Sequence, residues 1–148
     1  MSKEILLLSG PNLDLLGTRN PEIYGTTTLA EHVARFSELA RDAGFSVRHV
    51  QSNFEGDLIE AVHGAREAAV AIVINAGALT HSSWALADAL DAFSGIKVEV
   101  HISNPAAREP FRHLSTLAGS VSGSIAGFGA TSYELALDAV RRLTSTSS

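Results

Sequence analysis

An arginine and a tyrosine five residues apart, Arg19 and Tyr24, are the first side chains in the sequence that could transfer a proton together. A free phenol is a weak base at neutral pH, but a neighbouring guanidinium charge favours the phenolate, which is a better base. Both residues lie between Gly17 and Gly25, and glycines at such positions let a loop open and close over a pocket. The pattern predicts a general base on a closing loop, although an ordinary surface loop would have the same composition.

A histidine and a glutamate two residues apart, His101 and Glu99, are the candidates for a general acid. Alternate residues of a strand project to the same face, so the carboxylate can orient the imidazole through one ring nitrogen. A histidine in an apolar strand is more often a core residue with a satisfied hydrogen bond. Two ionisable groups in one buried strand nevertheless need partners or a function, which favours a proton-donating pair.

The elements that must position these residues follow a regular alternation. Five apolar runs alternate with segments of helical period, which is the pattern of a parallel sheet covered by helices on both faces. The predicted strands are residues 5–8, 45–50, 70–74, 97–102 and 121–126. The predicted helices are residues 29–43, capped by Thr27-Thr28, residues 55–68, a segment from Ser82 or Ser83 through Phe93, and residues 132–143. We therefore expect an α/β fold, a flavodoxin-like three-layer sandwich with a five-stranded parallel sheet in the order 2-1-3-4-5.

Polar residues suited to a pocket follow four of the five predicted strands. They are Ser9 and Asn12, residues 51–53, Asn75 with His81, and His101 with Ser103. Ligands of open parallel sheets lie beyond the carboxyl ends of the strands. We expect the site at this edge, with the weakly alternating second strand at one side of the sheet and the third strand in its centre.

The composition indicates a single globular domain. The chain has 148 residues, 45% of them hydrophobic, and is expected to form one domain over residues 1–148 with a frayed tail at 144–148. No apolar run approaches the ~20 residues of a membrane span, and no signal peptide is recognisable, so we expect a cytoplasmic protein without a membrane partner. The absence of cysteine excludes disulfides and thiolate chemistry. A formal net charge of −5 argues against a nucleic-acid partner, and an anionic substrate would need a local group of arginines.

Residues 9–25, S-G-P-N-L-D-L-L-G-T-R-N-P-E-I-Y-G, resemble the opening signature of the type II 3-dehydroquinate dehydratases. Later segments extend the similarity over nearly the whole chain: Q-S-N-F-E-G, I-N-A-G-A-L-T-H-S-S, E-V-H-I-S-N and A-R-E-P-F-R-H. The resemblance implies the flavodoxin-like fold. It also implies the reversible dehydration of 3-dehydroquinate to 3-dehydroshikimate, a step of the shikimate pathway, without cofactor or metal.

The resemblance also implies roles for individual residues. In that family an anti elimination passes through an enolate, with the matching Tyr24 as base, His101 as acid and Arg19 as a further catalytic residue of the loop. Asn12 matches an asparagine that acts near the enolate through an ordered water. The substrate contacts that match are Asn75, His81, Arg112 and the backbone of Ile102 and Ser103, with Arg108 either binding directly or fixing the loops.

A homo-oligomer is implied as well, namely a dodecamer built of trimers, in which an aspartate of one subunit completes the site of the next. Asp88 is the matching residue. Several positions depart from the family pattern: Ala87 stands where an arginine often precedes the aspartate, Phe54 replaces a histidine, and Ala76 replaces a proline. None of these departures removes a proposed catalytic group.

The main alternative is a flavodoxin-like module that binds a phosphate or a small molecule without catalysis. The turn Gly10-Pro11-Asn12 matches neither a P-loop nor a G-x-G-x-x-G motif, and its proline lacks an N–H that a phosphate cradle needs. A serine hydrolase of the G-x-S-x-G type is excluded because the motif is missing. Metal-dependent hydrolysis is disfavoured, since none of the six histidines form an i, i+4 pair around a carboxylate.

Overall fold

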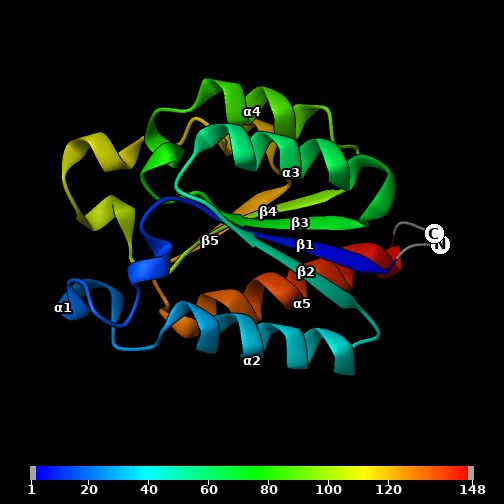
Figure 1. Cartoon of the computed structure of the whole chain (residues 1–148), viewed down its shortest axis with the longest axis horizontal. Coiled ribbons are helices and arrows are strands. Elements are labelled where there is room, and N and C mark those ends of the chain that lie inside the picture. The colour runs from blue at the N-terminus through cyan, green and yellow to red at the C-terminus, as the bar shows by residue number, and fades with distance from the viewer. Residues whose placement is uncertain (1–2, 147–148) are drawn as a thin grey trace.

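Within residues 3–146, which a computed structural model describes, five strands form one parallel sheet in the order β2-β1-β3-β4-β5 (Figure 1). The strands are β1 (Glu4–Ser9), β2 (Ser46–Gln51), β3 (Ala71–Asn75), β4 (Ile96–His101) and β5 (Gly123–Ala126). The expected positions of the second strand at an edge and of the third strand in the centre are confirmed.

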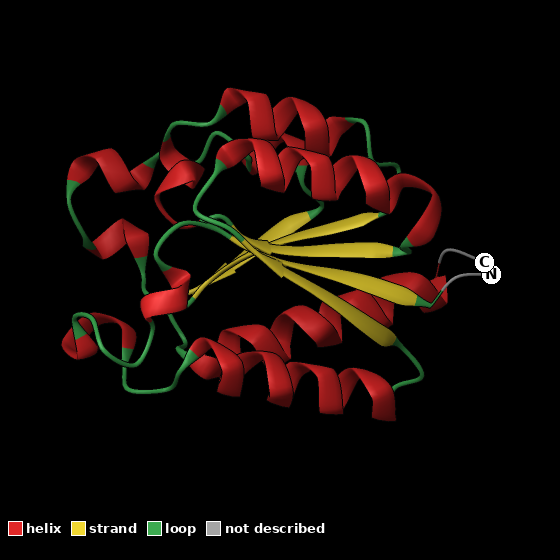
Figure 2. Ribbon diagram, viewed as in Figure 1, coloured by secondary structure: helices red, strands yellow, loops and turns green. Residues whose placement is uncertain are grey.

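Helices cover both faces of the sheet and complete a three-layer sandwich (Figure 2). Helices α2 (Leu29–Asp42) and α5 (Ala130–Thr146) lie on one face, and α3 (Glu55–Ala68) and α4 (Trp84–Asp91) lie on the other. The short α1 (Pro21–Tyr24) lies in the loop after β1, and 3-10 turns occupy Leu13–Leu15, Gly77–His81, Pro105–Ala107, Pro110–His113 and Ala118–Ser120. The predicted flavodoxin-like architecture is therefore confirmed. In the described part of the chain, no helix has both the length and the apolar character needed to cross a membrane.

The sheet separates two hydrophobic cores, because both faces of its strands are covered. Along β1, Ile5 and Leu7 belong to the core beneath α2 and α5, whereas Leu6 and Leu8 belong to the core beneath α3 and α4. All four side chains are at most 1% exposed. Apolar residues are thus needed at consecutive positions, and this explains why the strands read as continuous apolar runs in the sequence.

The carboxyl ends of β1, β3 and β4 meet at one edge, since β3 pairs with both of the other strands. The loops after β1 and β3 are in close contact, and the Gly10 N–H donates to the Asn75 carbonyl at 2.8 Å. A Cβ at Gly10 would lie 2.3 Å from the Ala76 carbonyl oxygen, so only glycine fits this approach. The two loops form a continuous floor on which a site can be built.

Some strand boundaries differ from those predicted. β1 includes Glu4 and Ser9, and β3 includes Asn75, because a ladder uses backbone groups whatever the polarity of the side chain. β5 begins two residues later than predicted, since the 3-10 turn Ala118–Ser120 and the residues that follow it lie before Gly123.

The last helix also differs from its prediction at both ends. It begins at Ala130, two residues before the predicted start at Ser132. It continues to Thr146, within the segment 144–148 that was expected to be a frayed tail, and the Thr144 hydroxyl donates there to the Val140 carbonyl at 2.8 Å. Residues 147–148 of that predicted tail lie outside the described residues.

Candidate active site

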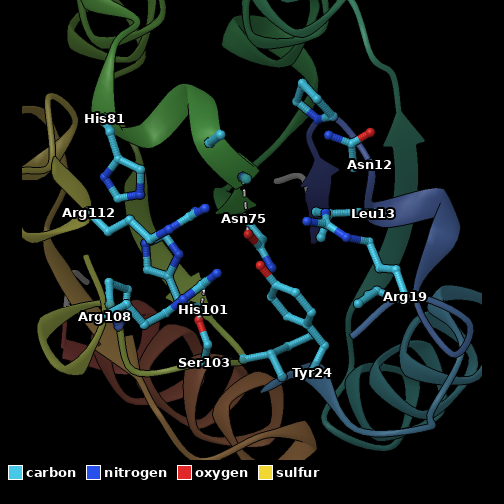
Figure 3. Close-up of a pocket in the computed structure, with 16 residues that line it drawn as sticks. Asn12, Leu13, Arg19, Tyr24, Asn75, His81, His101, Ser103, Arg108 and Arg112 are labelled. Atoms are coloured by element: carbon cyan, nitrogen blue, oxygen red, sulfur yellow. Dashed lines mark hydrogen bonds between the residues drawn. The ribbon is translucent and has the colours of Figure 1, made fainter. Parts of the chain in front are cut away.

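A pocket of about 220 Å³ lies at the carboxyl ends of β1, β3 and β4, the edge where the topology of the sheet predicts a site. Side chains from several loops converge on it (Figure 3). Sequence patterns and the family resemblance suggested a set of site residues, and most of them line this pocket. They are Asn12, Arg19, Tyr24, Asn75, His81, His101, Ile102, Ser103, Arg108 and Arg112. Glu99 and Asp88 do not line it, and their positions are described below.

Tyr24 is the last residue of α1, and in Figure 3 it lies between two guanidinium groups. The guanidinium carbon of Arg19 is 5.0 Å from the centre of the tyrosine ring, and that of Arg108 is 5.2 Å from it. Asn20 and Gly25, which flank α1, both have positive φ, and these turns direct the tyrosine back towards the sheet. The loop therefore brings the predicted arginine to the tyrosine, and a second arginine joins them.

His101 lies at the end of β4 with Glu99 behind it. The His101 Nε2 is 2.5 Å from Glu99 Oε2, and Glu99 is only 2% exposed. The other carboxylate oxygen of Glu99 accepts a hydrogen bond from the Ser115 hydroxyl at 2.8 Å. Because the ionised carboxylate can only accept, Nε2 carries a hydrogen, and Nδ1 is the nitrogen left for a group in the pocket. The predicted orienting contact between Glu99 and His101 is present.

Asn12 occupies a left-handed turn, with φ of 68°, immediately after the Gly10-Pro11 step. Its backbone N–H donates to Asn53 Oδ1 at 2.9 Å, and the Gln51 amide donates to the Gly10 carbonyl at 3.2 Å. Gln51 and Asn53 were expected as pocket groups, but they do not line the pocket. They stabilise the turn that carries Asn12, because their side chains bond to its backbone.

Two basic side chains at the pocket, His81 and Arg112, are held by neighbouring residues. His81 Nδ1 is 2.7 Å from the Leu114 carbonyl oxygen, so Nδ1 carries the hydrogen and Nε2 is left for a ligand. Arg112 Nε donates to the Glu109 carboxylate at 2.5 Å. This hydrogen bond is the main reason that the pKa of Glu109 lies below its ordinary value. Both basic groups are therefore fixed before any substrate is bound.

Arg108 connects Tyr24 with the segment after β4. Its Nη1 donates to the Ser103 hydroxyl at 3.2 Å, and its Nε is buried without a hydrogen-bond partner among the described residues. Ile102, next to Ser103, is 6% exposed and contributes to the pocket wall. The arrangement places positive charge beside a serine hydroxyl and the backbone that follows β4.

Asp88 is exposed on α4 and does not reach the pocket of its own chain. Trp84, one helical turn earlier on the same helix, is 63% exposed. Residues four apart share one face of a helix, so a large aromatic and a carboxylate are presented together to the outside. The buried Ala87 beside them is part of the core beneath α4.

Sequence reasoning did not identify two residues that support the pocket. Ser115 bonds to Glu99, and the Tyr133 hydroxyl lies 3.3 Å from Asn75 Nδ2. Tyr133 is a buried residue of α5, and only its helical period, which marks a core position, was visible in the sequence. Ser115 lies in a polar loop whose sequence carries no signal for such a contact.

The pocket combines a tyrosine beside cationic side chains, a histidine bonded to a carboxylate, and a side-chain amide. Such a set can remove a proton from carbon, donate one to a leaving group and hold an anionic, hydroxylated molecule. Among residues 3–146, no three histidine, aspartate or glutamate side chains are grouped in a way that could hold a metal ion.

A family model described as dehydroquinase class II matches residues 3–141. The chain belongs to the class II dehydroquinase family. The prediction of an enzyme of this family, made from the motifs, is thereby confirmed.

Relatives within the class II dehydroquinase family are similar over nearly their whole length. A 3-dehydroquinate dehydratase of Cereibacter sphaeroides (strain ATCC 17029) is 53% identical over 145 residues, which cover 98% of this chain and 97% of that protein. One of Xanthomonas oryzae pv. oryzae is 55% identical over 137 residues, covering 92% and 93%. The crystal structure of the type II dehydroquinase from Propionibacterium acnes superposes with a TM-score of 0.90 at 45% identity, covering 96% of this chain and 98% of that one.

Proposed function

We propose that this protein catalyses the reversible dehydration of 3-dehydroquinate to 3-dehydroshikimate. The observation that carries the proposal is one pocket that holds both a tyrosine between two guanidinium groups and a histidine backed by a buried glutamate. These are a candidate base and a candidate acid, and dehydration of a β-hydroxy ketone needs one of each. The names of the relatives, which are 52–55% identical, support the same reaction.

In the proposed reaction, the Tyr24 phenolate removes a proton from the carbon next to the ketone, and the electron pair moves into an enolate. Arg19 and Arg108 favour the phenolate because an anion beside two cations is stabilised. Asn12 holds the enolate oxygen through an ordered water. The enolate then expels the β-hydroxyl group in an anti elimination, and His101 donates a proton to it, so that water leaves and a conjugated enone remains.

The remaining pocket residues bind the substrate. We place its carboxylate against the backbone N–H groups of Ile102 and Ser103, since successive N–H groups beside a hydroxyl attract an anion. Asn75, His81 and Arg112 bind its hydroxyl groups. The cluster of arginines at the pocket supplies the local positive charge that a chain of net charge −5 needs to bind an anion.

We also propose that the protein is a homo-oligomer, a dodecamer built of trimers, in which Asp88 of one subunit completes the site of another. Asp88 is exposed on α4 and outside its own pocket, and Trp84 on the same face is 63% exposed. Large aromatic side chains are enriched at protein interfaces, so the exposed Trp84 favours a contact with another subunit on this face. The departure at Ala87 does not alter this face, because that side chain is buried beneath the helix.

The activity is tested by following the absorbance of the conjugated enone when the purified protein is mixed with 3-dehydroquinate. We expect turnover in the wild type and its loss in Tyr24→Phe, which removes only the phenol oxygen, with fold and ligand binding retained. A variant that keeps more than about a tenth of kcat, a difference of ~1.4 kcal/mol, would show that Tyr24 is not the base. An inactive wild type that carries a flavin spectrum would support the alternative, a binding module of this fold.

A further inference from the structure

We propose that Tyr133 is a positioning residue that fixes the orientation of the Asn75 side-chain amide towards the substrate. Its hydroxyl oxygen lies 3.3 Å from Asn75 Nδ2, and the two residues are 3% and 4% exposed. Tyr133 comes from α5, the last helix of the fold, whereas Asn75 is the final residue of the central strand. The inference rests on the proposed function, in which Asn75 binds a substrate hydroxyl.

The orientation of the amide follows from the groups on either side of it. The Gly77 backbone N–H lies 3.2 Å from one side of the Asn75 amide, and a backbone N–H can only donate. The atom facing it must be Oδ1, so Nδ2 faces the Tyr133 oxygen, which accepts. A flipped amide would direct Nδ2 at the Gly77 N–H, two donors facing each other.

This arrangement determines what Asn75 can offer to a substrate. One N–H of Nδ2 is bonded to Tyr133 and one lone pair of Oδ1 to Gly77. One donor and one acceptor of the amide remain, and Asn75 lines the pocket. A substrate hydroxyl matches such a pair, because it can accept from Nδ2 and donate to Oδ1 at the same time.

Tyr133 itself is held in place by α2. Its ring centre is 5.2 Å from that of His32 and 6.5 Å from that of Phe36, with an edge-on contact to the phenylalanine. Burial raises the pKa of Tyr133 to about 12, so the hydroxyl stays neutral near neutral pH. A neutral hydroxyl at a fixed position gives the Asn75 amide a hydrogen-bond acceptor that does not move.

The contact is tested by a double-mutant cycle on kcat/KM with 3-dehydroquinate. Tyr133→Phe removes one oxygen and keeps the ring, and we expect it to lower kcat/KM about tenfold, mainly through a higher KM. In an Asn75→Ala background the same change should cost less than about twofold, because the amide it positions is gone.

The matched control is Ser132→Ala, which removes a buried hydroxyl from the preceding residue of α5. That hydroxyl accepts from the Phe128 N–H at 3.0 Å and does not contact Asn75. We expect any effect of the control to be equal in both backgrounds. Equal effects of Tyr133→Phe in the two backgrounds, or a change of less than twofold in the wild type, would overturn the positioning role.

A second measurement does not depend on turnover. The ¹⁵N resonance of the Asn75 side-chain amide, assigned with Asn75→Ala, should shift in Tyr133→Phe, and its protons should exchange faster with solvent, whereas Ser132→Ala should change neither. An unchanged resonance would overturn the contact and with it the proposal, even if Asn75→Ala is too slow to assay. A shifted resonance in a protein that does not dehydrate 3-dehydroquinate would overturn the proposed function and leave the contact standing.

Discussion

At the scale of single residues, several of the proposed catalytic or binding groups are held by residues that do not line the pocket. Glu99 holds His101, and the Asn53 amide oxygen holds the backbone of Asn12. The supporting residues are buried or bonded to backbone, so they add no reactive group of their own. They restrict the orientation of the side chain in front of them, and correct orientation before the reaction contributes to rate.

The pair His101–Glu99 yields a prediction at this scale. Glu99→Gln keeps the size of the side chain but removes the negative charge that faces the imidazole Nε2 at 2.5 Å. The cationic, proton-donating form of the ring then loses its partner. We expect kcat to fall at least about tenfold with little change in KM, because general acid catalysis contributes roughly 10²–10⁴ in rate.

Glu134→Gln is the matched control for this change, since Glu134 forms an ion pair on the surface with Arg35 at 3.8 Å. Its activity should equal that of the wild type. Circular dichroism shows whether both variants are folded. A Glu99→Gln protein that retains more than half of the wild-type kcat would contradict the assignment of Glu99 as the residue that supports the acid.

At the scale of elements, the fold keeps the reactive groups on short loops between well-packed strands and helices. α1 carries Tyr24 and is followed by the N-terminus of α2, so the start of α2 is the point at which the catalytic loop joins the fold. That start has a complete capping box. The Thr28 hydroxyl accepts from the Glu31 N–H at 3.1 Å, and the Glu31 carboxylate accepts from the Thr28 N–H at 3.2 Å.

We predict that Thr28→Ala lowers the free energy of unfolding by about 1 kcal/mol, the usual effect of removing such a cap. The backbone N–H of Glu31 loses its acceptor in this variant. Urea unfolding at equal protein concentration measures the change. Thr26→Ala, a change of the same type at an exposed loop position, is the control and should be close to neutral. Equal stabilities of the two variants would count against the capping box.

At the scale of the whole molecule, one buried and one partly buried histidine link stability to pH. Burial lowers the pKa of His32 and of His49 from the ordinary value of 6.5, and at His32 the nearby Glu31 opposes this only in part. The unfolded chain therefore binds more protons than the folded one just below this value. Stability is full above pH ~6.5 and is lost as the pH falls towards the folded pKa values.

We expect the free energy of unfolding to be lower at about pH 5.5 than at about pH 7.5, with a smaller difference in His32→Phe. The pKa values of three carboxyl groups are also lowered, from ordinary values of 4.5 for Glu31 and Glu109 and 3.8 for Asp138. Their effects on stability therefore belong to more acidic solutions. Urea titrations at the two pH values measure the difference. A protein that is equally stable at both, or more stable at the lower pH, would refute this account.

The proposed assembly predicts a shared site, which a mixing experiment can detect. Tyr24→Phe and Asp88→Ala should each be nearly inactive alone. When equal amounts are dissociated and reassembled as cyclic trimers, roughly a quarter of all sites should combine an intact Tyr24 with a neighbour's intact Asp88. Activity recovered to about that level would support the shared site. Full activity of Asp88→Ala alone, or no recovery on mixing, would contradict it.

Much of the fold and of the site was visible in the sequence. Consecutive apolar residues such as Ile5 to Leu8 predict a strand buried on both faces, and the capping residues Thr27-Thr28 predict the start of α2, because both signals act between neighbours in the chain. Spacing made Arg19, Tyr24 and His101 candidates, the family resemblance implied their roles, and all three line the pocket. The spacing of Glu99 and His101 determined their shared face, since a strand alternates with period two.

Only the tertiary structure decided which distant residues support the site. Arg108 reaches the ring of Tyr24, and Tyr133 reaches Asn75 across 58 positions of the chain. Such contacts depend on the strand order and on how α5 packs under the sheet, and neither leaves a local signal. A buried tyrosine fits the apolar periodicity of a helix whether or not its hydroxyl forms a hydrogen bond. The physical reason is that periodicity records which side chains are buried, whereas a hydrogen bond depends on where two separate backbones place single atoms.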